Sequence, residues 1–132
     1  TVYGKTRYVM DKYGYSSVYR VTDYKNGFDG YKGEDVMCLD EFNSSLNIQF
    51  MNNLLDCYPL TLPARYSNKQ MCATKIYIIS NIPLNEQYKL IQYEHFSIYR
   101  AFLRRINYII KFNQDGSIDE REYKGEMLYE ED

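Results

Sequence analysis

Residues 36–42 read VMCLDEF, and this stretch predicts a buried strand that ends in two carboxylates. Its first four residues form a continuous apolar run, which is typical of a strand that is covered on both faces of a parallel sheet. Asp40 and Glu41 follow the run directly, so the strand would bring two carboxylates to the carboxyl edge of the sheet. Ligands of open α/β sheets bind at that edge, and we therefore expect the functional site there.

Segments with strand and helix character alternate on both sides of this run. Strand-like composition occurs at 17–22, 36–39, 76–80 and 106–112. Helical periodicity occurs at 5–13, at 43–58 with Asn43, Ser44 and Ser45 as candidate caps, and at 85–104 in two pieces. Residues 60–75 are typical of an extended hairpin. This order predicts an α/β fold with a mostly parallel sheet flanked by helices.

The composition excludes several classes of protein. A length of 132 residues, 45% of them hydrophobic and 26% charged, suits one globular domain. No segment approaches the roughly 20 apolar residues of a membrane span, and no signal-peptide pattern opens the chain. Cys38, Cys57 and Cys72 form no CxxC pair, which disfavours structural zinc and favours a reducing, intracellular setting. The single histidine, His95, is expected to have a packing or surface role.

The charge is divided unevenly along the chain. Residues 1–112 carry 14 Lys and Arg and 10 Asp and Glu, whereas residues 113–132 carry 2 and 8. We therefore expect a mildly basic folded domain over 1–112 and an acidic, flexible tail over 113–132. The chain also holds 16 tyrosines and no tryptophan, and we assign most of the tyrosines to packing.

The tripeptide Gly4-Lys5-Thr6 at the start of a predicted helix matches the end of the phosphate-binding motif G-x-x-x-x-G-K-[ST]. In that motif backbone N–H groups hold phosphate oxygens, the lysine neutralises their charge and the hydroxyl binds Mg²⁺. The tripeptide also occurs by chance. Only the second half of the motif is present, because its first glycine would lie two residues before Thr1.

Asp40 and Glu41 have the Walker B arrangement, in which Asp40 holds hydrated Mg²⁺ and Glu41 orients or deprotonates water. The alternative is a solvated acidic turn, and the presence of GKT upstream favours the catalytic interpretation. Asn81 ends the next buried strand, where its amide could sense the γ-phosphate or position water. An ordinary turn is the alternative for Asn81.

Arg104 and Arg105 precede the last predicted strand. Either could be an arginine that enters the nucleotide site of a neighbouring subunit, or both could simply complement the dipole of a helix end.

Basic and aromatic residues also occur in and around the predicted hairpin. Such residues on a protruding loop can grip single-stranded nucleic acid without reading its sequence, although a solvated loop would look the same. The residues concerned are Arg65, Tyr66, Lys69 and Lys75.

Taken together, these motifs resemble the superfamily 3 helicase domain of rolling-circle replication initiators (Rep proteins) of circoviruses, related single-stranded DNA viruses and plasmids. The similarity runs from Gly4 to about Phe112. The segments that carry it are 4–6, 28–34, 36–42, 58–61, 78–81 and 102–106. The order DGYKGE, Walker B, YPLT and SN is more specific than any one of these motifs.

The resemblance implies a P-loop NTPase (AAA+-like) fold that uses ATP and Mg²⁺ to translocate on and unwind DNA. It implies single-stranded DNA as partner, a homo-oligomer, commonly a hexamer, and no membrane association. A plasmid or phage protein would be cytoplasmic, and a eukaryotic virus protein would act in the host nucleus. The alternatives are a non-catalytic nucleic-acid-binding or oligomerisation fragment and an RNA-virus-type RNA helicase.

The start of the chain departs from the family pattern, because the central strand of the family's sheet precedes the phosphate loop. We expect this chain to be truncated before that strand and to bind ATP poorly. We also expect the strand at 106–112 to lack its usual neighbour.

Overall fold

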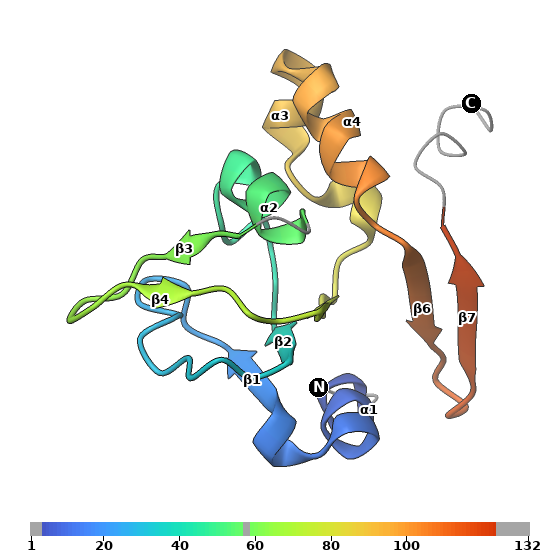
Figure 1. Ribbon diagram of the computed structural model, residues 1–132. Helices are drawn as coiled ribbons and strands as arrows, with labels where there is room; N and C mark the ends of the chain where they lie inside the picture. Colours follow the sequence, from blue (N-terminus) through green and yellow to red (C-terminus); the bar gives the residue numbers. More distant parts are fainter. Residues whose placement is uncertain (1–3, 57–58, 124–132) are drawn as a thin grey trace.

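A three-stranded parallel sheet forms the centre of the computed structural model, which describes residues 4–56 and 59–123 (Figure 1). Strand β2 (Val36–Leu39) lies between β1 (Val18–Val21) and β5 (Lys75–Ile78). Val36 is opposite Val18 on one side and Lys75 on the other. All four residues of β2 are buried, so the predicted buried strand and parallel sheet are confirmed.

Helices cover the sheet on both faces, which completes the predicted α/β fold. On one face, α1 (Lys5–Tyr13) packs Val9 against Val36 and Cys38. On the other, Met37 and Leu39 belong to the larger core. This core also holds buried side chains of α2 (Ile48–Leu55) and α4 (Phe96–Arg104). The residues of β2 belong alternately to the two cores because neighbouring residues of a strand point to opposite faces of the sheet.

Cys38 is part of the smaller core, and burial raises the pKa of its thiol to about 12. It is therefore a packing residue at neutral pH.

The second helix begins later than the sequence predicted. α2 starts at Ile48, and the side chain of Asn47 caps it by accepting hydrogen bonds from two backbone N–H groups, Gln49 at 2.9 Å and Phe50 at 3.3 Å. The expected caps at 43–45 instead form a turn, in which the Asn43 N–H donates to Ser45 Oγ at 2.9 Å. The expectation was wrong because serine and asparagine favour turns as well as caps.

The segment 85–104 contains two helices, as expected. A short turn, η2 (Leu84–Glu86), precedes α3 (Lys89–Glu94), and α4 follows after His95. His95 is exposed, in agreement with a surface role. At the other end of the chain, η1 (Tyr15–Ser17) joins α1 to β1. None of the described helices is long and apolar enough to cross a membrane.

Two antiparallel hairpins lie outside the central sheet. β3 (Thr61–Leu62) pairs with β4 (Lys69–Gln70) and confirms the hairpin predicted over 60–75. β6 (Tyr108–Phe112) pairs with β7 (Ile118–Glu122) and, among the described residues, with no strand of the central sheet. Part of the predicted acidic tail forms β7, whose backbone pairs with β6 and whose five side chains are all exposed. Residues 124–132 lie outside the described part of the chain.

Tyrosines supply many of the largest buried side chains, as the composition suggested. Tyr31 and Tyr99 are each 1% exposed, and their hydroxyls donate to the carbonyls of Glu34 and Leu84 at 2.9 and 2.8 Å. The hydroxyl of Tyr88 likewise donates to a backbone carbonyl. A tyrosine can thus fill the core while its hydroxyl satisfies a loop carbonyl at the edge of that core.

Candidate functional site

Residues from α1, β2 and β5 meet at the carboxyl edge of the central sheet. Lys5 Nζ donates to the carbonyl of Ser80 at 2.7 Å and to Asn81 Oδ1 at 3.3 Å. Thr6 Oγ1 donates to Asp40 Oδ2 at 2.8 Å. The predicted phosphate-loop, Walker B and strand-end residues are therefore neighbours, although up to 76 positions separate them in the sequence.

The start of α1 has the properties of an anion site. Gly4 caps the helix in the left-handed conformation (φ 77°) and has no side chain to accept from the first N–H groups. No acidic residue lies in the first turn. The N–H groups that point out of a helix start and the helix dipole together favour a phosphate at such a position. Lys5, on that same turn, adds a positive charge, so these residues fit the phosphates of a nucleotide.

Asp40 is a fully buried carboxylate surrounded by donors. Its Oδ2 accepts from Thr6 and also from Arg20, whose Nε and Nη2 lie 2.8 and 2.7 Å away. Its Oδ1 accepts from the Glu41 N–H at 2.9 Å. Burial by itself would raise the pKa of Asp40, but these hydrogen bonds and the charge of Arg20 outweigh it and lower the pKa. Asp40 is therefore ionised at neutral pH.

The donor set around Asp40 fits Mg²⁺. A carboxylate and a hydroxyl lie 2.8 Å apart, and both are hard oxygen ligands. The described residues contain no group of three or more His, Cys, Asp or Glu that could hold a metal by themselves. Mg²⁺ commonly binds through one or two carboxylates, water and substrate phosphates rather than an all-protein cage.

Glu41 differs from Asp40 in being exposed, and its backbone is strained. Its φ of 51° is in the left-handed region, which costs an ordinary residue about 1–2 kcal/mol. Among the described residues only two other non-glycines, Ser44 and Tyr88, have a positive φ. Ser44 lies three positions after Glu41 in the sequence, and the Tyr88 N–H donates to Ser44 Oγ at 2.7 Å. Backbone strain of this kind is concentrated at functional sites.

Gln87 connects the two loops of the site and was not found from the sequence. Its side-chain amide is buried and donates to Ser80 Oγ at 3.0 Å and to the carbonyl of Phe42 at 3.3 Å. Its Oε1 accepts from the Ser44 N–H at 2.7 Å. The segment after β2 and the end of β5 are therefore held in a fixed relation by one residue.

Arg20 was also missed by the sequence analysis. A signal was present, because an arginine in the otherwise apolar strand VYRV needs a partner or solvent. The parallel register pairs Arg20 with Cys38, two positions before Asp40, so its guanidinium reaches that carboxylate. The register between β1 and β2 cannot be derived from the sequence alone, so the pairing of Arg20 with Asp40 could not be predicted.

The two arginines at the end of α4 have different surroundings. Arg105 binds Asp56 at the end of α2, with Nε and Oδ1 2.7 Å apart, and donates to the carbonyl of Ala101 at 2.8 Å. Arg104 is exposed and, among the described residues, forms no ion pair. Neither arginine contacts Asp40 or Lys5 within the described chain.

The four predicted nucleic-acid residues do not form one group. Arg65 and Tyr66 lie on the β3–β4 loop, where Tyr66 is 88% exposed, and Lys69 lies in β4. Lys75 is instead the first residue of β5, at the amino edge of the sheet, and pairs with Asp35 at 3.6 Å. The hairpin therefore gathers three of the four residues.

The DGYKGE segment fixes the hairpin to the central sheet. Asp29 accepts from the Arg65 N–H at 2.9 Å and pairs with its guanidinium at 2.5 Å. The Tyr31 hydroxyl accepts from the Cys72 N–H at 3.0 Å. These bonds join residues about 40 positions apart in the sequence, and they give the DGYKGE motif a structural role in holding the hairpin.

A family model described as RNA helicase matches residues 2–81, which is more than half of the chain. The chain belongs to this RNA helicase family. The matched segment contains Gly4, Lys5, Thr6, Asp40, Glu41 and Asn81, and it ends before Arg104 and Arg105.

Two viral replication-associated proteins are similar to the chain. That of beak and feather disease virus is 34% identical over 86 residues, which cover 65% of this chain and 29% of the relative. That of goose circovirus is 29% identical over 113 residues, which cover 86% of this chain and 36% of the relative. The chain thus spans about a third of the length of these relatives. With the family match, they support its assignment to the helicase domain of Rep proteins.

Proposed function

We propose that this chain is the ATP-hydrolysing helicase domain of a replication-associated protein, and that the parent protein unwinds DNA during rolling-circle replication. The observation that carries the proposal is the meeting of Lys5, Thr6, Asp40 and Asn81 at one sheet edge. These residue types suit the binding of a nucleoside triphosphate, and a neighbouring exposed carboxylate, Glu41, suits its hydrolysis.

Each residue has a distinct role in this proposal. The N–H groups at the start of α1 and the ammonium of Lys5 bind phosphate oxygens. Glu41 orients a water molecule and accepts its proton, and Asn81 positions the same water beside Lys5. Thr6 and Asp40 would hold Mg²⁺, which supplies positive charge to the phosphate oxygens.

Arg104 is the better candidate for an arginine that acts on a neighbouring subunit's nucleotide. Arg105 is held by Asp56 within its own chain, so reaching a neighbour would cost that ion pair. Arg104 is exposed and can extend from the end of α4 without such a cost. This role requires a homo-oligomer, for which we propose the hexamer that is usual in the family.

The β3–β4 hairpin is proposed to contact single-stranded DNA. Arg65 and Lys69 supply positive charge for phosphates, and the exposed ring of Tyr66 offers a stacking surface. Lys75 is left out of this contact, because it lies in β5 and pairs with Asp35.

The test is ATP binding and DNA-stimulated phosphate release with Lys5→Ala, Glu41→Gln and the control Glu86→Gln. We expect Lys5→Ala to lose ATP affinity, and Glu41→Gln to bind ATP but hydrolyse it at least about 100-fold more slowly. Glu86→Gln changes an exposed carboxylate on η2 and should behave like the wild type. Hydrolysis that survives both Lys5→Ala and Glu41→Gln would contradict the proposal.

Strand displacement on DNA and RNA duplexes identifies the nucleic acid. Displacement of RNA alone would favour the RNA helicase alternative.

A further inference from the structure

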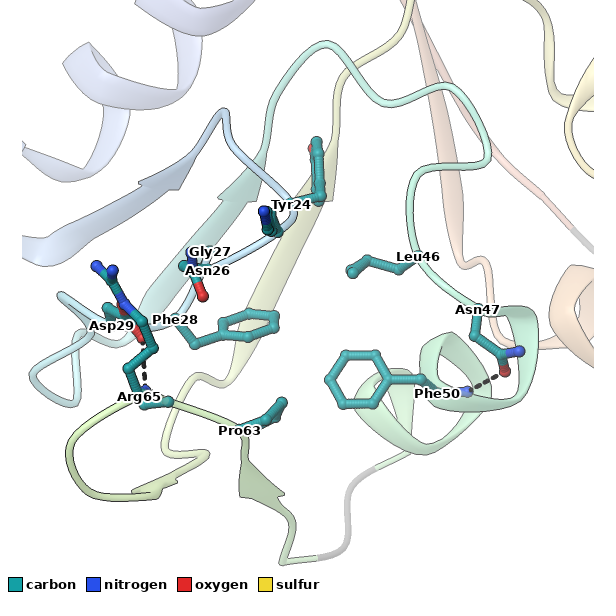
Figure 2. Close-up of a pocket in the computed structure, with 12 residues that line it drawn as sticks. Tyr24, Asn26, Gly27, Phe28, Asp29, Leu46, Asn47, Phe50, Pro63 and Arg65 are labelled. Carbon is teal, nitrogen blue, oxygen red and sulfur yellow. Dashed lines mark hydrogen bonds and ion pairs between the residues drawn. The ribbon is translucent and has the colours of Figure 1, made fainter.

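A cavity of about 400 Å³ opens beside the β3–β4 hairpin and shares no residue with the proposed nucleotide site (Figure 2). Its size falls within the usual range for small-ligand pockets, about 300–1,000 Å³. Three segments that are distant in sequence line it: 24–29 after β1, 46–50 at the start of α2, and 63–65 after β3.

The wall of the cavity is apolar and largely aromatic. Phe28 and Phe50 lie with ring centroids 5.8 Å apart and planes inclined by 47°. Figure 2 shows these two rings, Leu46 and Pro63 directed toward a common space. Phe28 is 4% exposed and belongs to the core, so this wall is a rigid extension of the folded interior. A flat, uncharged ring system would bury its faces well against such a wall.

The rim of the cavity is charged and is attached to the hairpin. Arg65 lines the cavity and pairs with Asp29 on the opposite segment, with Nε and Oδ2 2.5 Å apart. A guanidinium carries four further N–H groups beyond the Nε–H of this pair. Lys25 adds a second cation to the lining. The ring of the exposed Tyr66 lies beside Arg65, with its centroid 5.5 Å from Cζ.

We propose that this cavity binds one unpaired base of a single-stranded nucleic acid that lies along the β3–β4 hairpin. The base packs against Phe50 and Phe28, its flanking phosphates contact Arg65 and Lys25, and the next base stacks on Tyr66. The inference rests on the proposed function, because it requires nucleic acid at the hairpin.

The charge pattern selects this occupant over a protein side chain. An apolar residue of a partner would use the aromatic wall but would make no use of Lys25 or of the guanidinium N–H groups of Arg65 beyond its Nε–H. A nucleotide uses both features, since every base has a π-face and every linkage has a negative charge. Aromatic walls of this type accept any base, which suits a protein that moves along DNA of any sequence.

The experiment measures the affinity of the 132-residue chain for two labelled oligonucleotides by fluorescence anisotropy. One is an oligothymidylate of about 12 nucleotides, within the length range that such sites cover, and the other has the same length with abasic positions throughout. Phe50→Leu keeps apolar volume but removes the ring, and Ala64→Leu fills the cavity from the hairpin side. Thr61→Leu, at an exposed position on the same hairpin and outside the cavity lining, is the matched control.

We expect the wild type to bind the thymidylate about tenfold more tightly than the abasic strand. Phe50→Leu and Ala64→Leu should remove that preference and leave abasic binding unchanged, whereas Thr61→Leu should keep the preference. Far-ultraviolet circular dichroism checks that both cavity variants are folded.

Unchanged thymidylate affinity in both cavity variants would overturn the inference while nucleic-acid binding by the chain stands. A loss of self-association in those variants, measured by sedimentation with unchanged affinity, would assign the cavity to a second copy and also overturn it. If the wild type binds neither strand, nucleic-acid binding under the proposed function fails, and the cavity inference fails with it.

Discussion

Replacing Arg20 by methionine should destabilise the protein by about 2 kcal/mol at pH 7, because the change leaves a buried carboxylate without its cation. Arg20 donates a hydrogen bond to the Asp40 carboxylate through Nε, and its Nη2 forms an ion pair with the same oxygen at 2.7 Å. Methionine keeps most of the apolar stem of the side chain. The loss of stability therefore reports on the ion pair rather than on packing.

The magnitude follows from the exposure of the two partners. Breaking a fully buried ion pair costs about 3–5 kcal/mol, and breaking an exposed one costs about 0–1 kcal/mol. The side chain of Asp40 is 0% exposed and that of Arg20 is 45% exposed, so this pair lies between the two limits. Water can reach Arg20 but not Asp40, and Asp40 keeps the donors from Thr6 and Glu41.

The effect should depend on pH in a defined direction. In the wild type the folded-state pKa of Asp40 is lowered, so its contribution to stability is present above the unfolded pKa of about 3.9 and is lost as pH falls through the folded value. In Arg20→Met, burial should raise the folded pKa, so protonation in acid stabilises the variant. The stability gap between the two proteins should therefore narrow as pH falls from 7 toward 3.

Urea unfolding followed by circular dichroism at pH 7 and at acid pH measures this gap. The control is Arg7→Met, because Arg7 pairs with Asp11 at 3.9 Å and both side chains are more than half exposed. The free energy of unfolding of this control should fall by less than about 0.5 kcal/mol. An Arg20→Met loss equal to that of the control, or a gap that does not narrow in acid, would refute the reasoning.

Three further predictions concern the loops and caps. Gln87→Leu should lower the free energy of unfolding by about 2–3 kcal/mol, because it removes the hydrogen bonds that join the two loops of the site. For the same reason it should slow ATP hydrolysis more than it weakens ATP binding. Gln70→Leu, at an exposed position, is the control for urea unfolding. Asn47→Ala should cost about 1 kcal/mol through loss of the α2 cap, and an equal cost for the exposed Asn53→Ala would contradict this. Glu41→Gly should raise the thermal midpoint by relieving the positive φ while it abolishes hydrolysis, and a lowered midpoint would show that no strain is stored there.

Local pattern predicted much of the fold because several segments have only one favourable environment. The run Val36–Leu39 has no polar face, which predicted a strand covered on both sides. The break between α3 and α4 and the β3–β4 hairpin were also predicted. The site location followed from these strands, because parallel strands end at the same edge.

Other elements could not be predicted because non-local contacts decide them. β7 carries the sequence IDERE, which has little strand character, and it forms through backbone bonds to β6. The start of α2 depends on Gln87, 43 positions after Ser44, holding the preceding turn. Lys75 looked like part of the hairpin, and its side chain instead pairs with Asp35.

The stretch VMCLDEF at residues 36–42 by itself determined a buried strand and two carboxylates at its end, because continuous apolar content is a local property. The tertiary structure decided that these carboxylates differ. Asp40 is buried and surrounded by donors from α1 and β1, whereas Glu41 remains exposed on a strained backbone. Burial, register and charge pairing come from distant segments, and so the chemistry of the two acids is fixed only when the sheet and α1 come together.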